Sequence, residues 1–369
     1  MGNIKDYIDW RGDITLQKAH FNEVDNLIFS EIVYIDLKKI VDRKKIKLGE
    51  AINSYLEKGI KYDLPLSEDP IPFLKVLKDS VRFKDLKIFN YVNISSKKEE
   101  KQFCAISIEL NYNTIYVSFK GTDNTLFGWK EDFNLSFMSE IPSQLEAVQY
   151  VNNISRRYKN IILGGHSKGG NLALYAAINC NKRIKKRIKK VYNNDGPGFL
   201  EEFTTTKDYN NVLKKVVTIV PETSIIGMLL TRKEEYKVVK SSGIGIWQHD
   251  ALSWQVQGDH FVTIKEVDET SNKINSVLNE WLIKIGKKER ETFVNNLFQI
   301  LDKNKIETIE DLSKLQIRKI PGLVKSFKSL EEDNRKLMVD LLVDLVREAK
   351  KNFDTKTILR GIKLMSKKS

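Results

Sequence analysis

The sequence predicts an α/β fold in which a mainly parallel central sheet lies between helices in three layers. Two observations support this prediction. After residue 100, short runs rich in Ile, Val, Phe and Tyr alternate with segments of helical spacing, and strands that alternate with helices favour parallel pairing. From about Glu269 the strand signals stop, and apolar residues recur at helical spacing between charged ones.

The expected elements follow the chain in order. The first hundred residues are expected to be mostly helical, with turn-rich patches at 62–65 and 69–72. Two strand-like runs joined by Asn111-Tyr112-Asn113 predict a β-hairpin. The predicted strands are residues 102–109, 114–119, 160–163, 191–193, 212–220 and 236–240, and the predicted helices are residues 171–178, 274–285, 290–301 and 334–351.

A chain of 369 residues suggests one large domain with an accessory segment. We therefore predict a sheet-containing domain at residues 1–269, with a helical N-terminal part, and a basic helical C-terminal region at residues 270–369. Two cysteines, Cys104 and Cys180, do not make a disulfide framework and favour a reducing compartment. No signal-peptide pattern and no membrane-spanning apolar run is found. We expect a cytoplasmic protein, with a peripheral place at a membrane as the alternative.

The net charge of +13 predicts affinity for anionic surfaces. Lys and Arg exceed Asp and Glu by 8 from Ser271 onward, and a second basic run occupies residues 182–190. Ile184 and Ile188 interrupt that run at helical spacing, which suits either a helix on anionic lipid headgroups or a solvated helix face. Nucleic acid is not expected as a partner, because no zinc-finger spacing, RNP-like motif or stacking run accompanies the charge.

The stretch Gly165-His166-Ser167-Lys168-Gly169 matches the pattern G-x-S-x-G, with an apolar strand before it and a helix after it. A serine hydroxyl is a poor nucleophile unless it is exposed, aimed and close to a base, and a sharp strand-to-helix turn with small residues two positions on either side provides that exposure. The alternative is a glycine-rich phosphate-binding loop, but the P-loop order G-x-x-x-x-G-K-[ST] is missing. The stretch predicts a serine hydrolase of the α/β-hydrolase type with Ser167 as nucleophile.

The candidates for the catalytic base can be reduced by elimination, because the chain contains only four histidines and this fold orders its triad as serine, acid, histidine. His20 precedes the sheet, and His166 lies inside the turn, where its side chain is expected to point away from the hydroxyl. His249 follows the predicted strand 236–240 on a glycine-containing loop and is favoured. His260 stays as the alternative.

The acid should follow a strand between Ser167 and His249. Asp195, at the end of the strand beginning at residue 191, is preferred, and Glu222 is the fallback, because triad acids are recognised by geometry rather than by spacing. The backbone N–H of Lys168, at a helix N-terminus, is one expected donor to an oxyanion. Thr122, in the turn after the strand 114–119, is the second, through its N–H and its hydroxyl, unless Gly121-Thr122-Asp123 is an ordinary turn.

These stretches resemble class 3 lipases. Phe119-Lys120-Gly121-Thr122 followed by Trp129 and Asp132 is similar to their F-R-G-T…W…D pattern, and residues 165–173 resemble their G-H-S-L-G-G-A-L-A turn. The resemblance is closer to a bacterial, lipase-like family of unknown function and runs to about residue 265. It includes the stretches at residues 7–13, 21–25, 194–199 and 248–250.

The resemblance implies a triad of Ser167, Asp195 and His249, with Thr122 and Lys168 shaping the oxyanion hole. The sequence departs from the lipases in three places: Lys168 stands for Leu, Lys120 stands for Arg, and residues 220–224 blur the D-x-V-P acid motif.

The residues and the resemblance together predict hydrolysis of a carboxylic ester with a lipid-like or acyl group, phospholipids included, through an acyl-enzyme and without metal or organic cofactor. The apolar run 225–230 could line an acyl pocket or pack as core, and core is favoured. The alternative function is a catalytically weak hydrolase scaffold that binds membrane or nucleic acid through its basic surface. Esterases, phospholipases, thioesterases and acyltransferases share this machinery, so the fold does not choose among them.

Overall fold

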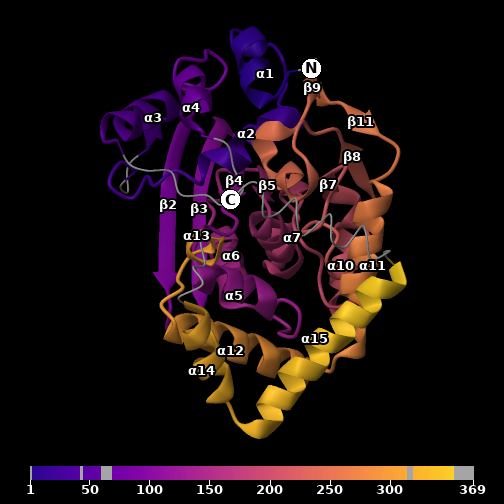
Figure 1. Ribbon diagram of the computed structural model, residues 1–369. Helices are drawn as coiled ribbons and strands as arrows, with labels where there is room; N and C mark the ends of the chain where they lie inside the picture. Colours follow the sequence, from indigo (N-terminus) through magenta and orange to yellow (C-terminus); the bar gives the residue numbers. More distant parts are fainter. Residues whose placement is uncertain (1, 42–44, 60–68, 314–318, 353–369) are drawn as a thin grey trace.

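In the computed structural model, which describes residues 2–41, 45–59, 69–313 and 319–352, one large sheet runs through the middle of the molecule (Figure 1). Its nine strands lie in the order β1-β2-β3-β4-β5-β6-β7-β8-β11, and β9 pairs with β10 in a separate two-stranded sheet. The strands are β1 (Ile46–Lys47), β2 (Lys87–Ser96), β3 (Lys101–Asn111), β4 (Thr114–Phe119), β5 (Asn160–His166), β6 (Ile188–Asn194), β7 (Val216–Pro221), β8 (Tyr236–Val239), β9 (Val256–Gln257), β10 (His260–Phe261) and β11 (Thr263–Ile264).

Helices precede, connect and follow these strands. The α-helices are α1 (Ile4–Arg11), α2 (Glu23–Ile32), α3 (Leu48–Glu57), α4 (Ile71–Leu77), α5 (Leu126–Asn134), α6 (Pro142–Asn152), α7 (Lys168–Asn179), α8 (Lys182–Lys185), α9 (Glu201–Thr204), α10 (Lys207–Val212), α11 (Glu269–Lys284), α12 (Lys287–Lys303), α13 (Ile309–Ser313), α14 (Ile320–Lys328) and α15 (Glu332–Asn352). Short 3₁₀ turns are η1 (Leu213–Lys215), η2 (Gly245–His249) and η3 (Ala251–Ser253).

The pairing within the sheet confirms the predicted fold class. Strands β4 to β8 pair in parallel, each with the next. Strands β1 to β4 and the pair β8–β11 are antiparallel. The predicted hairpin is β3–β4, where a register shift between Glu109 and Asn111 lets Asn111 pair with Thr114, so that only two residues connect the strands. The three-residue connection was wrong because Asn111 still belongs to the strand.

Two apolar clusters lie on opposite faces of the sheet and create the three layers. Along β3, Ile106 and Ile108 join the cluster that packs beneath α1 to α4, whereas Phe103 and Ala105 join the cluster covered by α6, α7 and α10. This alternation is the period of two that a strand buried on both faces produces. The carboxyl ends of the parallel strands therefore meet at one edge of a rigid, covered sheet.

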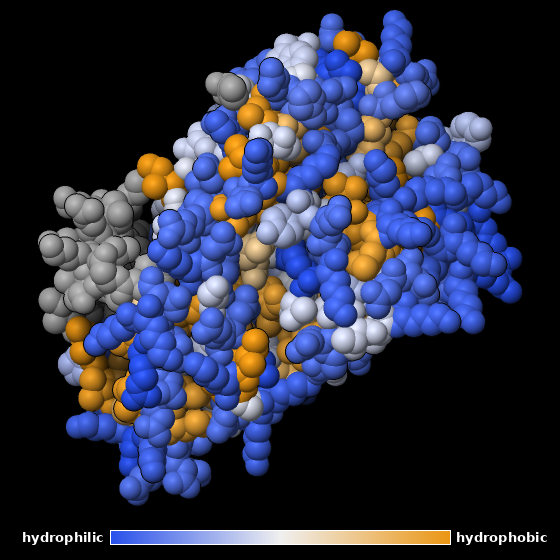
Figure 2. Space-filling view, turned by 90° about the vertical axis from the view of Figure 1, so that its right-hand side faces the viewer, coloured by the Kyte–Doolittle hydropathy of each residue, from blue (hydrophilic) through white to orange (hydrophobic). Residues whose placement is uncertain are grey.

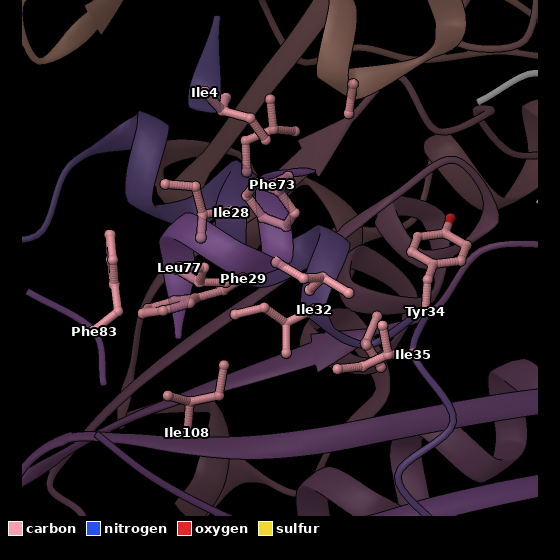
Figure 3. Close-up of a cluster of buried hydrophobic side chains, with 14 of the residues drawn as sticks. Ile4, Ile28, Phe29, Ile32, Tyr34, Ile35, Phe73, Leu77, Phe83 and Ile108 are labelled. Atoms are coloured by element: carbon pink, nitrogen blue, oxygen red, sulfur yellow. The ribbon is translucent and has the colours of Figure 1, made fainter. Parts of the chain in front are cut away.

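The cluster beneath the N-terminal helices also reaches toward that edge. Figure 3 shows Ile28, Phe29 and Ile32 of α2 packed with Ile108 of β3, and Tyr34 at the margin of the group. The Tyr34 hydroxyl accepts the backbone N–H of Gly121 at 3.0 Å and donates to the His166 carbonyl at 3.3 Å. Apolar packing of α2 thus fixes a polar contact at the ends of β4 and β5.

Of the helices after Glu269, α11, α12, α14 and α15 run along the bottom and right of the view in Figure 1, where α12 packs on α5, α14 and α15, and α11 packs on α15. They share an apolar cluster with Leu126, whose N–H donates to the Glu307 carbonyl at 2.8 Å. The side that carries α11 is mainly hydrophilic, with apolar residues exposed in separate patches (Figure 2). The division at residue 269 stays a prediction.

Two predictions about elements were wrong. Residues 87–96 form the strand β2, whereas the first hundred residues were expected to be mostly helical, and residues 212–215 are helical rather than part of β7. Strand β2 gave a weak signal because only Ile88 and Phe89 are buried along it. The turn-rich patch at 62–65 lies outside the described residues.

The basic run 182–190 is not one amphipathic helix. Only Lys182–Lys185 is helical, and β6 begins at Ile188. Ile184 and Ile188 are both buried in the core cluster beneath α7, so the run has no apolar face to offer a lipid surface. Among the described residues, no helix is long and apolar enough to cross a membrane.

Candidate active site

A strained serine stands between β5 and α7, at the carboxyl edge of the sheet. Ser167 has φ +58° and ψ −134°, a conformation that residues with a side chain rarely adopt. The two flanking glycines permit this turn. A Cβ on Gly165 would lie 2.4 Å from the carbonyl carbon of Gly169, and one on Gly169 would lie 2.1 Å from the carbonyl oxygen of Phe119. The local sequence therefore builds the sharp strand-to-helix turn that exposes a hydroxyl.

Asp195 and His249 meet beside this turn. Asp195 follows β6 with φ +51°, is fully buried, and holds its Oδ2 at 2.6 Å from His249 Nδ1. Its other oxygen accepts the Ser224 hydroxyl at 2.5 Å, and Gly227 leaves room for it, because a Cβ there would lie 2.0 Å from Oδ1. A carboxylate at Nδ1 fixes the imidazole as the Nδ1–H tautomer and leaves Nε2 as an acceptor.

The alternative residues lie elsewhere. The backbone of Glu222 joins β8 to the start of α11, through its N–H to the Val239 carbonyl at 3.0 Å and its carbonyl to the Asp268 N–H at 2.9 Å. His260 is largely exposed beside Asp259, and His20 is exposed. Of the predicted triad residues and their alternatives, the structure brings Ser167 and His249 to one cavity, with Asp195 behind His249.

His166 packs against His249, with ring centroids 4.6 Å apart. Its Nε2 lies 2.8 Å from the His249 carbonyl oxygen, to which the neutral ring donates, and its Nδ1 lies 3.5 Å from Glu31 Oε1. Burial, together with His249, lowers the pKa of His166 well below its ordinary value. Burial, together with Asp250, raises the pKa of Glu31 well above its own. Burial thus favours the neutral form of both side chains, and His166, beside Glu31, holds the loop that carries His249.

Glu31 and Tyr34 were missed by the sequence analysis. A carboxyl group inside the apolar run 27–33 was the one available signal for Glu31, since charged residues are rarely buried without a reason. Tyr34 had no such signal, because a tyrosine after an apolar helix is ordinary core. A Cβ on Gly121 would lie 2.2 Å from the Tyr34 hydroxyl oxygen, so glycine at 121 lets that contact form.

The backbone N–H groups of Lys168 and Thr122 are the two predicted donors to an oxyanion. Lys168 is the first residue of α7, so its N–H has no intrahelical acceptor. Within the described part of the chain, no backbone carbonyl takes the N–H of Thr122. The Thr122 hydroxyl instead donates to Asp132 Oδ2 at 2.5 Å. The N–H of Thr122 therefore remains as a donor for a substrate oxyanion, because the hydroxyl already donates to Asp132. Both groups were expected from the sequence to act as donors.

The side chain of Lys168 forms a buried ion pair under this site. Its Nζ lies 2.8 Å from Glu131 Oε2 and 3.8 Å from Asp132 Oδ1, and both Lys168 and Glu131 are almost fully buried. Burial opposes the charge on Lys168, but the carboxylates of Glu131 and Asp132 outweigh it and raise the pKa of the ammonium. Burial raises the pKa of Asp132 to about 6.

These groups open on a cavity of about 290 Å³. Ser167, His249, Thr122 and Lys168 line it at the sheet edge, and most of the rest of its lining is apolar. The apolar lining comes from two parts of the chain: Trp129, Phe133, Leu135, Pro197, Ile226, Leu229 and Leu230 before residue 269, and Leu278, Trp281, Leu282, Ile285, Phe293, Val294 and Leu341 after it. The preference for core packing of the run 225–230 was wrong, because Ile226, Leu229 and Leu230 line this cavity.

Among the described residues, no group of three or more His, Cys, Asp or Glu side chains is arranged to hold a metal ion. Cys104 and Cys180 are buried free thiols. The expectation that no cofactor is needed stays a prediction.

Comparison with known protein families shows to which family the chain belongs. The Mbeg1-like family matches residues 77–299, which is more than half of its length. The chain belongs to the Mbeg1-like family. No curated protein matches it. Among solved structures, this Mbeg1-like protein is similar to M37 lipase, with 14% identity, a TM-score of 0.35, and coverage of 56% of this chain and 70% of that one. It is also similar to a fungal lipase–inhibitor complex, with 14% identity, a TM-score of 0.36, and coverage of 60% and 81%.

Proposed function

We propose that this Mbeg1-like protein is a serine hydrolase that cleaves a carboxylic ester. Ser167 is the nucleophile, His249 the base and Asp195 the acid. One observation carries the proposal: His249 Nδ1 is 2.6 Å from the buried Asp195 carboxylate, and the same imidazole lines a cavity with a serine held at φ +58°. Strain at a serine beside a carboxylate-oriented imidazole has no evident use in a mere scaffold.

The reaction follows from these positions. His249 Nε2 takes the proton of the Ser167 hydroxyl as its oxygen attacks the ester carbonyl. The resulting oxyanion accepts hydrogen bonds from the N–H groups of Thr122 and Lys168, which are already in place before the charge develops. The imidazolium then gives its proton to the leaving alkoxide, and an acyl-enzyme remains. Water, deprotonated by the same imidazole, attacks the acyl-enzyme and releases the acid and the free serine.

Asp195 and His166 act on the base from two sides. Asp195 stabilises the imidazolium that forms when His249 takes the proton. His166 holds the carbonyl of His249 through a 2.8 Å contact and, as a neutral ring, adds no positive charge against that imidazolium. We therefore regard His166 and Glu31 as positioning residues.

A fluorophosphonate probe tests the proposal, because it reacts with activated serines only. Wild-type protein should be labelled, and Ser167→Ala should not. Ser136 is a matched control: it lines the same cavity, but its hydroxyl donates to the Phe133 carbonyl at 2.7 Å, so Ser136→Ala should be labelled like wild type. Hydrolysis of p-nitrophenyl acetate should fall in Ser167→Ala by about a million-fold, to background. Folded wild-type protein that neither reacts with the probe nor cleaves the ester would overturn the proposal.

A cytoplasmic location and contact with an anionic membrane stay predictions. The alternative function, a catalytically weak scaffold that binds membrane or nucleic acid through its basic surface, is less well supported, because the burial of Ile184 and Ile188 leaves the basic run 182–190 without an apolar face.

A further inference from the structure

One wall of the cavity is a single face of α11. Leu278, Trp281 and Leu282 are spaced by three residues and one residue, which places them on one side of α11, and Ile285 caps the C-terminal end of that helix. All four line the cavity. The neighbouring Ile283 is 80% exposed and faces away. The helical periodicity of α11 thus determines which of its side chains face the cavity.

Other C-terminal helices hold this wall in place. The Trp281 indole N–H donates to the Leu341 carbonyl of α15 at 2.9 Å. The Trp281 ring meets Phe293 of α12 edge to face, with centroids 5.9 Å apart. Phe293 and Leu341 also line the cavity. Contacts among the three helices α11, α12 and α15 therefore fix the position of Trp281 in the cavity wall.

The chemistry of the occupant follows from where the polar groups lie. The ester-cleaving groups and the oxyanion donors are at the sheet edge, and the α11 wall offers no hydrogen-bonding side chain apart from the engaged indole of Trp281. Arg290 lines the cavity too; its Nη1 donates to the Ser136 carbonyl, and its buried Nε has no hydrogen-bond partner among the described residues. A group that lies against the α11 wall with its carbonyl at Ser167 is therefore apolar where it contacts that wall.

We propose that α11 is the acyl-binding wall of the enzyme and that the substrate is an ester of one medium-length, unbranched fatty acid. The volume of about 290 Å³ is near the lower end for small-molecule pockets, which suits one chain rather than two. This assigns the C-terminal helices to substrate selection. The reaction at the carbonyl rests on the proposed function, whereas binding of the chain does not.

Chain length should then control the rate. Each buried methylene should raise kcat/KM about fourfold until the wall is covered. Leu282→Trp places a larger side chain in the cavity, and we expect it to lower the ratio of kcat/KM for p-nitrophenyl decanoate to that for p-nitrophenyl acetate by about tenfold or more. Ile283→Trp makes the same kind of change one residue along, on the exposed side, and should leave both esters unchanged. Equal loss on both esters, or no loss, in Leu282→Trp would overturn the assignment.

A binding measurement separates this inference from the proposed function. Decanoic acid should bind the Ser167→Ala protein in a calorimetric titration, and about tenfold or more weaker when Leu282→Trp is added. If decanoate binds but wild type cleaves no ester, the proposed hydrolase activity is contradicted and the acyl-binding wall is retained. If wild type cleaves esters but its chain-length preference does not change when α11 is altered, the acyl-binding wall is contradicted and the hydrolase activity is retained. Should Leu282→Trp fail to fold, Leu278→Ala gives the same answer in the other direction, since it enlarges the cavity and should move the preferred ester to a longer chain.

Discussion

Lys168 places a buried ammonium next to the nucleophile, where the lipases that the sequence resembles carry leucine. One carboxylate oxygen of Glu131 forms the ion pair that neutralises this ammonium. The carboxylate also accepts hydrogen bonds from the backbone N–H of Gln102 at 3.0 Å and from that of Ser143 at 2.9 Å. The pair thus joins the start of α7 to β3 and α6. A buried pair of this kind costs desolvation, but removing one partner costs more, because the other charge stays buried alone.

Lys168→Met tests this coupling. The variant leaves Glu131 with two N–H donors and no countercharge, so the free energy of unfolding should fall by about 3–5 kcal/mol. Adding Glu131→Gln should recover part of that loss, since no lone charge remains. Urea unfolding of wild type and of the two variants measures both steps. A single variant as stable as wild type, or a double variant less stable than the single, would contradict the account.

Substitutions of Asp195 and Glu222 should lower kcat to different extents. Asp195→Asn replaces the carboxylate at His249 Nδ1 with an amide that no longer fixes the tautomer or stabilises the imidazolium, so kcat should fall by about 10⁴. Glu222→Gln alters a side chain that does not line the cavity and should leave kcat unchanged. Steady-state kinetics on p-nitrophenyl acetate, with thermal unfolding to confirm the fold, measures both. A large loss in Glu222→Gln with a small one in Asp195→Asn would reverse the assignment.

Much of the candidate site could be predicted from the sequence, because several of its residues follow strands closely. Ser167 and Asp195 come directly after strands and Thr122 comes three residues after one, and chain order limited the choice of histidine to two. Glu31 and Tyr34 could not be predicted in the same way. They belong to the α2 region, and Tyr34 reaches a carbonyl 132 residues further along the chain, a distance that no local pattern spans.

At the scale of elements, the basic run 182–190 shows how a charge pattern misleads. Its two isoleucines have helical spacing in the sequence, but one lies on a short helix and the other starts a strand, and both point into the same core. The lysines around them are solvated because the segment connects two buried elements at the surface. The charges therefore carry no information about an apolar face.

Ile184 and Lys186 form a matched pair for testing this view. Ile184 is 3% exposed, so Ile184→Ala should lower the free energy of unfolding by about 2–5 kcal/mol. Lys186→Ala, at an exposed position two residues later, should change it by less than about 0.5 kcal/mol. Thermal or urea unfolding gives both values. An Ile184→Ala protein of unchanged stability that also loses binding to anionic liposomes would restore the membrane-facing interpretation.

The central strands could be predicted because each contains a run of apolar residues that is buried in the sheet, such as Ile115–Phe119 without Ser118 in β4. Strand β2 could not, since it has few fully buried residues and lies in a part of the chain dominated by helical spacing. The run 225–230 was assigned to the core because apolar residues usually lie there. Whether such a run faces other side chains or an empty volume depends on the helices above it, which are more than forty residues away in the sequence.

At the scale of the whole molecule, the C-terminal helices are joined to the sheet-containing part by backbone as well as by side chains. The Ile309 N–H donates to the Asn124 carbonyl at 3.0 Å, beside the bond from Leu126 to Glu307, and α12 packs on α5. The region of family likeness, 77–299, crosses residue 269 and includes α11. The sequence indicated where the composition changes, but not that both sides of that point would border one cavity.

The bond between Trp281 and Leu341 has a consequence for protein synthesis. Residues 167, 195 and 249 are all added to the chain before residue 341. A nascent chain that lacks residue 341 therefore already contains the proposed nucleophile, acid and base, but not the carbonyl to which the Trp281 indole of the proposed acyl wall donates.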